Sequence, residues 1–215
     1  MKQLNNLSEL KFIQHGFYNA SDSSQDKGPI LMNQVHSVDV LFLTEKPAEI
    51  PSVDALVTQT PNLNLTVKTA DCAPVLLADP ASQMIAAVHA GWRGAFQGIL
   101  EATILTMLEH GATLETICAG IGPHIQKNSF EIGSDIKALF PVTENCFFTP
   151  HNDKFLFDFD AYVIHRLKRA GIQSITSAGD DTYTDTSYFS YRRDPQNPGR
   201  QFSSIMIKGG NYDNN

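Results

Sequence analysis

Short strand patterns crowd the first 90 residues of the chain, with no long helical pattern between them. Six segments rich in Val, Leu, Ile and Thr are bounded by Pro, Asp or Asn, and they cover 12–18, 38–44, 55–58, 65–69, 75–78 and 84–89. Strands separated by such short gaps favour antiparallel or mixed pairing. The sequence therefore predicts an α+β fold, in which helices pack on the faces of mixed sheets.

The clearest helical pattern follows those strands. Apolar residues recur at helical spacing over 92–108, and Gly111 marks the end of that run. Shorter patterns predict a helix over 133–140 and another that Asp158 or Asp160 caps. The remaining strand patterns cover 116–120, 146–149, 155–159, 174–177 and 202–207.

Length, composition and charge narrow the class of protein. The 215 residues are 42% hydrophobic, which is enough to bury a full core and excludes a disordered chain. No shift in composition divides them, so we expect one domain over 1–215 with a frayed tail at 208–215. The formal net charge of -7 excludes non-specific binding to nucleic acid or to an anionic membrane. A local basic pocket for a small anion remains compatible with this net charge.

The start of the chain and its thiols indicate a compartment. The first ten residues contain no apolar run typical of a signal peptide, and no apolar stretch in the sequence is long enough to span a membrane. Cys72, Cys118 and Cys146 are odd in number and irregularly spaced, which is unlike a disulfide framework. We therefore expect a soluble cytoplasmic protein. Separately, we expect it to act on a small molecule and to be a monomer or a weak homodimer.

Three residues with metal-binding side chains stand at predicted strand ends or in the adjoining loops. They are His36, Cys72 and His89. Imidazole and thiolate are preferred ligands of zinc, and three protein ligands leave a fourth position open, as in catalytic sites. The spacing alone is also compatible with an interpretation without a metal, in which the three residues are a loop histidine, a small buried thiol and a histidine at a strand end.

A candidate anion site follows His89. A helix is predicted to begin at Trp92, and a helix N-terminus offers free backbone N–H groups and partial positive charge. Arg93 lies in that first turn, where its guanidinium could bind an oxyanion in a bidentate way. The alternative is an exposed arginine that lies along the ring of Trp92.

Several other polar residues are candidates for the same chemistry. Asp71 could act as a general base or as the partner of a ligating histidine, provided that the chain turns beside Cys72, and it could equally cap that turn. Tyr191 and Arg192 place a ring beside a guanidinium, which suits a base or sugar ring but also a solvated strand face. We expect His124 to lie in an exposed loop.

Five motifs in fixed order connect these residues. The chain reads NQVHS, TADCAPVLLAD, VHAGWRG, GIGP and SYRRD in turn. In this order the motifs resemble the bacterial laccase-domain family, whose members are described as polyphenol oxidases, purine nucleoside phosphorylases and peptidoglycan-editing factors. The resemblance extends from about His15 to Ile207, and the TADC and HAGWRG segments with their separation are its most specific part.

The resemblance implies both a site and an activity. It implies a zinc ion bound by His36, Cys72 and His89, with copper as the other metal to consider. It implies a sandwich of mixed sheets with helices packed on the outside, in α/β/β/α layers. The implied reaction is phosphorolysis of adenosine, inosine, guanosine and methylthioadenosine, with an adenosine deaminase activity beside it. Purine nucleoside and phosphate would then be the partners.

Other functions are compatible with the same residues. A multicopper phenol oxidase needs several coppers, whereas this chain has seven histidines and no His-X-His pair, so that function ranks low. A hydrolase or amidase that edits cell-wall precursors could use Cys72 as nucleophile with His36 or His89 as base. A binding module without catalysis is the remaining alternative.

The sequence departs from the family pattern near its start. Family members carry an arginine and a Gly-Gly turn soon after the segment that matches HGFY. Here the segment HGFYNASDSSQDKGP is short and has Asn19 near that position. We therefore expect part of the substrate-binding wall to be missing or replaced, which bears on the range of nucleosides.

Overall fold

The computed structural model describes residues 1–22, 28–197 and 199–209. Within them the first half of the chain forms α1 (Asn5–Ser8), β1 (Ile13–Phe17), β2 (Pro29–Ile30), β3 (Val40–Leu43), β4 (Ala55–Thr58), β5 (Asn64–Thr69), β6 (Ala73–Asp79) and β7 (Met84–Ala90). The second half forms α2 (Trp92–Gln97), α3 (Ile99–Glu109), β8 (Cys118–Ile121), β9 (Glu131–Ile132), α4 (Ser134–Lys137), β10 (Phe148–His151), β11 (Lys154–Phe157), α5 (Phe159–Arg169), β12 (Ser174–Ser177) and β13 (Gln201–Ile207). Single 3₁₀ turns cover Leu114–Thr116 and Lys127–Ser129, and a longer 3₁₀ helix covers Val142–Phe147.

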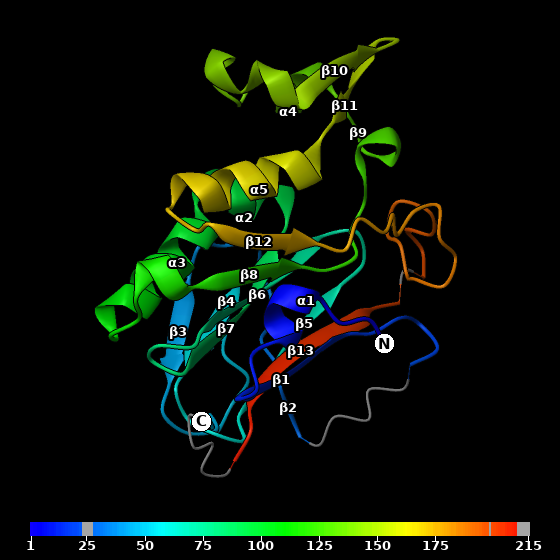
Figure 1. Cartoon of the computed structure of the whole chain (residues 1–215). Helices are drawn as coiled ribbons and strands as arrows, with labels where there is room; N and C mark the ends of the chain where they lie inside the picture. Colours follow the sequence, from blue (N-terminus) through cyan, green and yellow to red (C-terminus); the bar gives the residue numbers. More distant parts are fainter. Residues whose placement is uncertain (23–27, 198, 210–215) are drawn as a thin grey trace.

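Two mixed sheets pack face to face at the centre of the molecule (Figure 1). The larger follows the strand order β12-β8-β6-β7-β4-β3, and the smaller the order β1-β13-β5-β2. In the larger sheet β3 pairs with β4, and β12 with β8, in parallel, whereas the central strands are antiparallel. Leu65 and Ile205 of the smaller sheet share a buried cluster with Leu76 and Ile85 of the larger. The predicted α+β sandwich of mixed sheets is confirmed.

The second face of the larger sheet carries helices α2, α3 and α5 (Figure 1). Along β6, Leu76 and Ala78 pack toward the smaller sheet, while Val75 and Leu77 pack toward the helices, because side chains alternate along a strand. Burial on both faces explains why β6 and β7 are apolar almost throughout. The two central strands are thus fixed from both sides, which makes their ends a rigid support for a site.

The helix predicted over 92–108 is two helices. Gly98 separates α2 from α3 and has a φ of +110°, in the left-handed region that favours glycine. Its N–H donates to the carbonyl of Gly94 at 2.9 Å and closes α2 after six residues. Apolar spacing continues across this break, which is why periodicity alone predicted one helix.

The third sheet consists of β9, β10 and β11 and projects beyond α5 at one end of the molecule (Figure 1). The strands predicted over 146–149 and 155–159 pair as a hairpin, although 146–147 belong to a 3₁₀ helix rather than to a strand. The helix expected over 133–140 is reduced to the four residues of α4. α5 begins as predicted, since the carboxylate of Asp158 accepts a hydrogen bond from the N–H of Ala161 at 3.2 Å.

The structure corrects the placement of His124. This side chain is fully buried rather than exposed in a loop, and its Nδ1 lies 2.8 Å from the carbonyl oxygen of Gly122. Its Nε2 lies 3.5 Å from the carboxylate of Asp160 at the start of α5. A histidine after a Gly-Pro turn gives no sign of burial when the covering helix is distant in sequence.

Toward both ends of the chain the structure contains ordered segments that the sequence patterns did not predict. Helix α1 and strand β2 were not predicted, because elements of four and two residues show no periodicity. The tail expected at 208–215 begins with two ordered residues: the N–H of Lys208 donates to Phe12, and that of Gly209 to the side chain of Asn62. Residues 210–215, and residues 23–27 near the start of the chain, lie outside the described part. No helix among the described residues is long and apolar enough to cross a membrane.

Candidate metal centre

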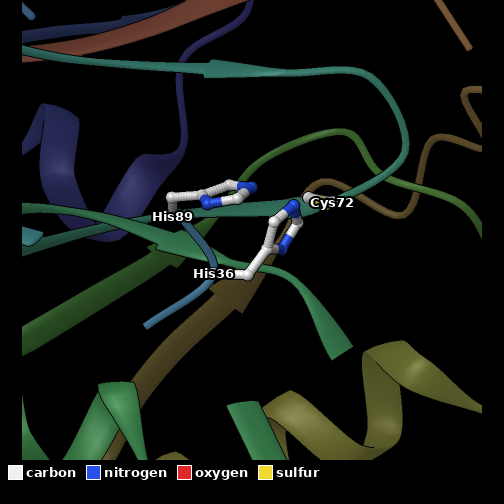
Figure 2. Close-up of side chains that lie close together, drawn as sticks. All are labelled: His36, Cys72 and His89. Atoms are coloured by element: carbon white, nitrogen blue, oxygen red, sulfur yellow. The ribbon is translucent and has the colours of Figure 1, made fainter. Parts of the chain in front are cut away.

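Three strand ends meet at one edge of the larger sheet. Strand β7 runs antiparallel to β4 and to β6, so the end of β7 lies beside the starts of the other two. His89 is the last residue but one of β7, Cys72 directly precedes β6, and His36 lies in the loop before β3. The candidate ligand atoms of the three side chains all lie within 4.8 Å of one another. Figure 2 shows them converging from three separate segments.

Asp54, directly before β4, positions two of the three side chains. Its Oδ1 accepts hydrogen bonds from Nδ1 of His89 at 2.7 Å and from the N–H of His36 at 3.1 Å. Its Oδ2 accepts from the backbone N–H groups of Ser37 and Val35 at 2.7 and 3.2 Å. Because Nδ1 of His89 is engaged in this way, Nε2 is the nitrogen that remains for a metal.

Backbone geometry and a glycine bring the ligands close together. His36 has a φ of +60°, a left-handed conformation that non-glycine residues adopt rarely, and the hydrogen bonds to Asp54 hold it there. A Cβ atom on Gly91 would lie 2.6 Å from Nδ1 of His36 and 3.3 Å from Sγ of Cys72. Only glycine at position 91 therefore lets His36 and Cys72 approach each other beside His89.

The donor set fits a tetrahedral transition metal. Two imidazoles and one thiol match the ligand types of zinc, and ligand atoms around a zinc ion lie ~3.5 Å apart, so small side-chain rotations would close the trio on one ion. His36, Cys72 and His89 are the one group of this kind among residues 1–22, 28–197 and 199–209.

Burial and nearby charges shift the pKa values of His89 and His36 in opposite directions. Burial alone would lower the pKa of His89, but the charges of Cys72 and Asp54 and their hydrogen bonds raise it to about 9. Burial and the repulsion from His89 lower the pKa of His36. Burial would raise the pKa of Asp54, yet hydrogen bonds from His89 and Ser37 lower it to about 2. Asp54 is therefore a buried anion that favours positive charge in the trio.

One cavity of about 750 Å³ gathers every residue that the sequence singled out for the site. These residues are His36, Asp71, Cys72, His89, Trp92, Arg93, Tyr191 and Arg192. They come from segments more than 150 residues apart, so the fold is what places them together. The candidate metal centre thus opens onto a space large enough for a small organic molecule.

Asp71 is engaged by a distant loop. Its Oδ1 accepts a hydrogen bond from the hydroxyl of Thr182 at 2.7 Å, and its Oδ2 accepts one from the N–H of Arg192 at 2.6 Å. Its φ of +81° makes the turn that the sequence required for Asp71 and Cys72 to reach one site. The carboxylate that orients His89 is that of Asp54, not that of Asp71.

Arg93 lies along the ring of Trp92, as one of its two interpretations expects. Its guanidinium lies over the ring of Trp92, 5.1 Å from the centroid, and both residues line the cavity. Tyr191 is 56% exposed and belongs to a turn rather than to a strand. The guanidinium of Arg192 packs over Phe130 at 5.7 Å and donates to the carbonyl of Glu131. Part of the cationic lining is therefore held in place by contacts with rings.

Other residues of the site were not predicted from the sequence. Asp54 is the most important of them, and Lys68, Phe130, Phe159 and Arg200 also line the cavity. The pairing of β4 with β7 could have revealed Asp54, because it places the residue before one strand beside the last residues of the other. The rings carried no signal, since a phenylalanine in a core and one in a cavity wall look alike in a sequence.

The fold and this site define a small-molecule-binding α+β protein with a candidate transition-metal centre at a sheet edge. The chain belongs to the family described as multi-copper polyphenol oxidoreductase laccase, whose model matches residues 16–208. That match covers all eight residues of the predicted site.

Named relatives are similar over most of the chain. The purine nucleoside phosphorylase YfiH of Shigella flexneri is 38% identical over 183 residues, which cover 83% of this chain and 74% of that protein. Adenosine deaminase RL5, from an unknown prokaryotic organism, is 33% identical over 196 residues, or 83% and 75% of the two chains. The crystal structure of Neisseria meningitidis protein NMB0706 matches with a TM-score of 0.78 at 36% identity and covers 84% of this chain and 75% of that one.

Proposed function

We propose that this protein is a zinc-dependent enzyme that cleaves purine nucleosides with phosphate. The observation that carries the proposal is the His36, Cys72 and His89 trio, which opens onto the same cavity that Arg93 lines. Three protein ligands beside a cation and an open space are typical of a catalytic centre that acts on an anionic or polar substrate. Relatives named purine nucleoside phosphorylase and adenosine deaminase support the substrate class.

The residues of the cavity match the needs of this reaction. In phosphorolysis a phosphate oxygen bonds to C1′ of the ribose while the bond from C1′ to the purine nitrogen breaks, and the purine leaves with that electron pair and gains a proton. Arg93 would bind the phosphate through charge-assisted hydrogen bonds. Tyr191, an exposed ring in the cavity lining, offers a ring face for the purine. A bound zinc would supply a Lewis acid that polarises a substrate oxygen or activates a water.

The proposed substrates are adenosine, inosine, guanosine and methylthioadenosine, with deamination of adenosine as a side activity. The deaminase activity rests on the relative of that name. We prefer zinc over copper because the copper function of the family name is phenol oxidation. An oxidase that reduces oxygen needs several metal ions, whereas the described residues form one ligand group. One copper bound to the same trio would be the alternative occupant.

The test is the release of free base from inosine by the purified protein, with phosphate and in a phosphate-free buffer. We expect release that depends on phosphate and that falls together with metal content in Cys72→Ala. Cys146→Ala is the matched control, since that thiol is exposed and does not line the cavity. Release that is equal in both buffers would indicate hydrolysis, and undiminished release by Cys72→Ala would refute the role of the trio.

A further inference from the structure

The loop that carries Tyr191 and Arg192 is held by polar contacts rather than by a core. Residues 182–193, all within the described part of the chain, form turns and irregular structure, and none of them belongs to either buried apolar cluster. A segment with little apolar packing depends on its hydrogen bonds for its order. The hydrogen bonds of this loop therefore decide how firmly its side chains are placed.

The guanidinium of Arg193 binds three backbone carbonyls of this loop. Its Nη1 donates to the carbonyl oxygens of Thr182 and Tyr183 at 2.7 and 2.8 Å, and its Nη2 donates to that of Tyr188. The planar fork of an arginine fixes its donors relative to one another, so these bonds hold both ends of segment 182–188 to one group. Arg193 itself does not line the cavity, and its effect on a ligand there must pass through its neighbours.

The backbone of Arg193 closes the turn that presents those neighbours. Its N–H donates to the hydroxyl of Ser190 at 3.1 Å, and Ser190 is 2% exposed. Tyr191 and Arg192 lie between these two residues, and both line the cavity. Arg193 thus ties this turn through its backbone and segment 182–188 through its side chain.

The other contacts of the turn show which side chain can meet a ligand. Asp71 accepts hydrogen bonds from the hydroxyl of Thr182 and from the N–H of Arg192. The side chain of Arg192 donates to the carbonyl oxygen of Glu131 at 2.9 Å, so its guanidinium is engaged by the protein. The ring of Tyr191, which is 56% exposed, is then the group of this turn that can contact a ligand in the cavity.

We infer that Arg193 is a positioning residue for the purine side of the cavity, which acts by holding Tyr191 in the cavity wall. The inference rests on the proposed function, in which Tyr191 offers its ring to the purine, and it assigns binding of the base and of phosphate to different segments. The hydrogen bonds of Arg193 lie within its own loop, whereas Arg93, proposed to bind phosphate, belongs to α2. The two substrates should therefore respond differently to the loss of Arg193.

The test measures the KM of inosine and the KM of phosphate separately during base release. In Arg193→Ala we expect the KM of inosine to rise about tenfold, while the KM of phosphate and kcat change less than about twofold. Arg193→Lys should recover part of the loss, since an ammonium still donates to some of the carbonyls. Arg169→Ala, a change at an exposed arginine outside the cavity, is the matched control and should alter neither KM.

A double substitution shows whether Arg193 acts through Tyr191. Tyr191→Ala should itself raise the KM of inosine, and Arg193→Ala in that background should raise it further by less than about twofold, because the effects of residues that act as a unit do not add. An equal rise with and without Tyr191, or an equal rise in the KM of both substrates, would overturn the inference. If Arg193→Ala loses its fold, Arg193→Lys decides between these outcomes by the same two KM values.

Binding of inosine, followed by the fluorescence of Trp92, separates this inference from the proposed reaction. Trp92 is the one tryptophan of the chain, and it lines the cavity. If the wild type binds inosine without releasing base, the proposed reaction fails, and a Kd about tenfold higher in Arg193→Ala still supports the positioning role. The same Kd in both proteins overturns that role alone. A wild type that binds no inosine would refute both.

Discussion

Asp54 accepts hydrogen bonds from three consecutive backbone N–H groups, one hydroxyl and one imidazole. The backbone donors belong to the loop that carries His36, and the imidazole is that of His89. One buried carboxylate therefore fixes the backbone conformation at His36 and the ring orientation of His89. Such partners of metal ligands affect metal affinity nearly as much as some ligands do.

Asp54→Asn should weaken metal binding about tenfold to hundredfold, because an amide cannot accept all of these hydrogen bonds and carries no charge. The free energy of unfolding should also fall by ~1–3 kcal/mol, since buried N–H groups lose an acceptor. Competition with a chelator measures the first quantity and urea unfolding the second. Asp39→Asn, an exposed change in the same loop, is the control. Equal metal affinity in Asp54→Asn and wild type would contradict this account of the site.

His15 should make the stability of the fold depend on pH. Burial lowers the pKa of His15 to about 4, and its Nε2 accepts a hydrogen bond from the N–H of Leu4 at 3.1 Å. Between about pH 6.5 and pH 4 the unfolded chain thus binds a proton that the folded chain does not, so the free energy of unfolding falls as the pH drops through this window. The loss attributable to His15 should be on the order of 2 kcal/mol.

His15→Gln keeps an acceptor for Leu4 and removes the titrating group. Urea unfolding of both proteins at pH 7.5 and pH 4.5 gives the comparison, and the wild type should lose more stability than the variant. Identical losses would show that protonation of His15 does not limit stability in acid.

The types of the candidate ligand residues were predictable, whereas their supporting residues were not. Histidine and cysteine carry metal chemistry in any context, so His36, Cys72 and His89 stood out. An aspartate before a strand is common in turns, and nothing local marks Asp54 as the partner of a histidine 35 residues away. His124 was misplaced for the same reason, because the helix that buries it follows 35 residues later.

At the scale of elements, Gly98 decides where one helix ends and the next begins. Gly98→Ala should lower the free energy of unfolding by ~1–2 kcal/mol, because its φ of +110° strains any residue with a Cβ. The nearest atoms to such a Cβ are side-chain atoms of Arg166 and Glu101 at 3.7 Å, so strain rather than a clash is the cause. Thermal unfolding measures the effect, with the exposed substitution Gln97→Ala as control. A variant as stable as wild type would mean that α2 and α3 tolerate a continuous helix.

The loop that carries Tyr191 and Arg192 is attached to the site through Asp71. Asp71→Ala removes the acceptor of Thr182 and of the Arg192 N–H, so we expect faster hydrogen exchange over 182–193 with an unchanged metal content. If the loop binds substrate, KM should rise more than kcat falls. If Asp71 only positions the loop, the pH profile of kcat should be the same in Asp71→Ala as in wild type. If the acidic limb of that profile is lost in the variant, Asp71 is a general base.

Strands were easier to predict than helices here. β4 and β12 match their predicted bounds, because β-rich segments between turn residues define both ends. The prediction of the helices was less accurate because two features do not appear in the apolar periodicity. One is the left-handed glycine at 98, and the other is the packing that leaves α4 only four residues. Strand pairing, which places the candidate metal site at one sheet edge, lay beyond any local pattern.

For the whole molecule, the sequence predicted the fold class and the list of candidate residues but not their arrangement. The antiparallel pairing of β7 with both β4 and β6 brings one strand end and two strand starts together, and long-range contacts fix that pairing. Helices on one face and a second sheet on the other hold the central strands rigid. The edge of the sheet can therefore carry a strained loop at His36 and a turn at Asp71 without loss of order.

The most direct test of the central claim is to titrate metal-free protein with zinc and to measure the release of base from inosine in phosphate at each step. The account predicts that activity is absent at the start, rises in proportion to bound zinc and reaches a plateau at about one ion per chain. Full activity in the metal-free protein, or zinc that binds at this stoichiometry to Cys72→Ala as it does to wild type, would contradict it.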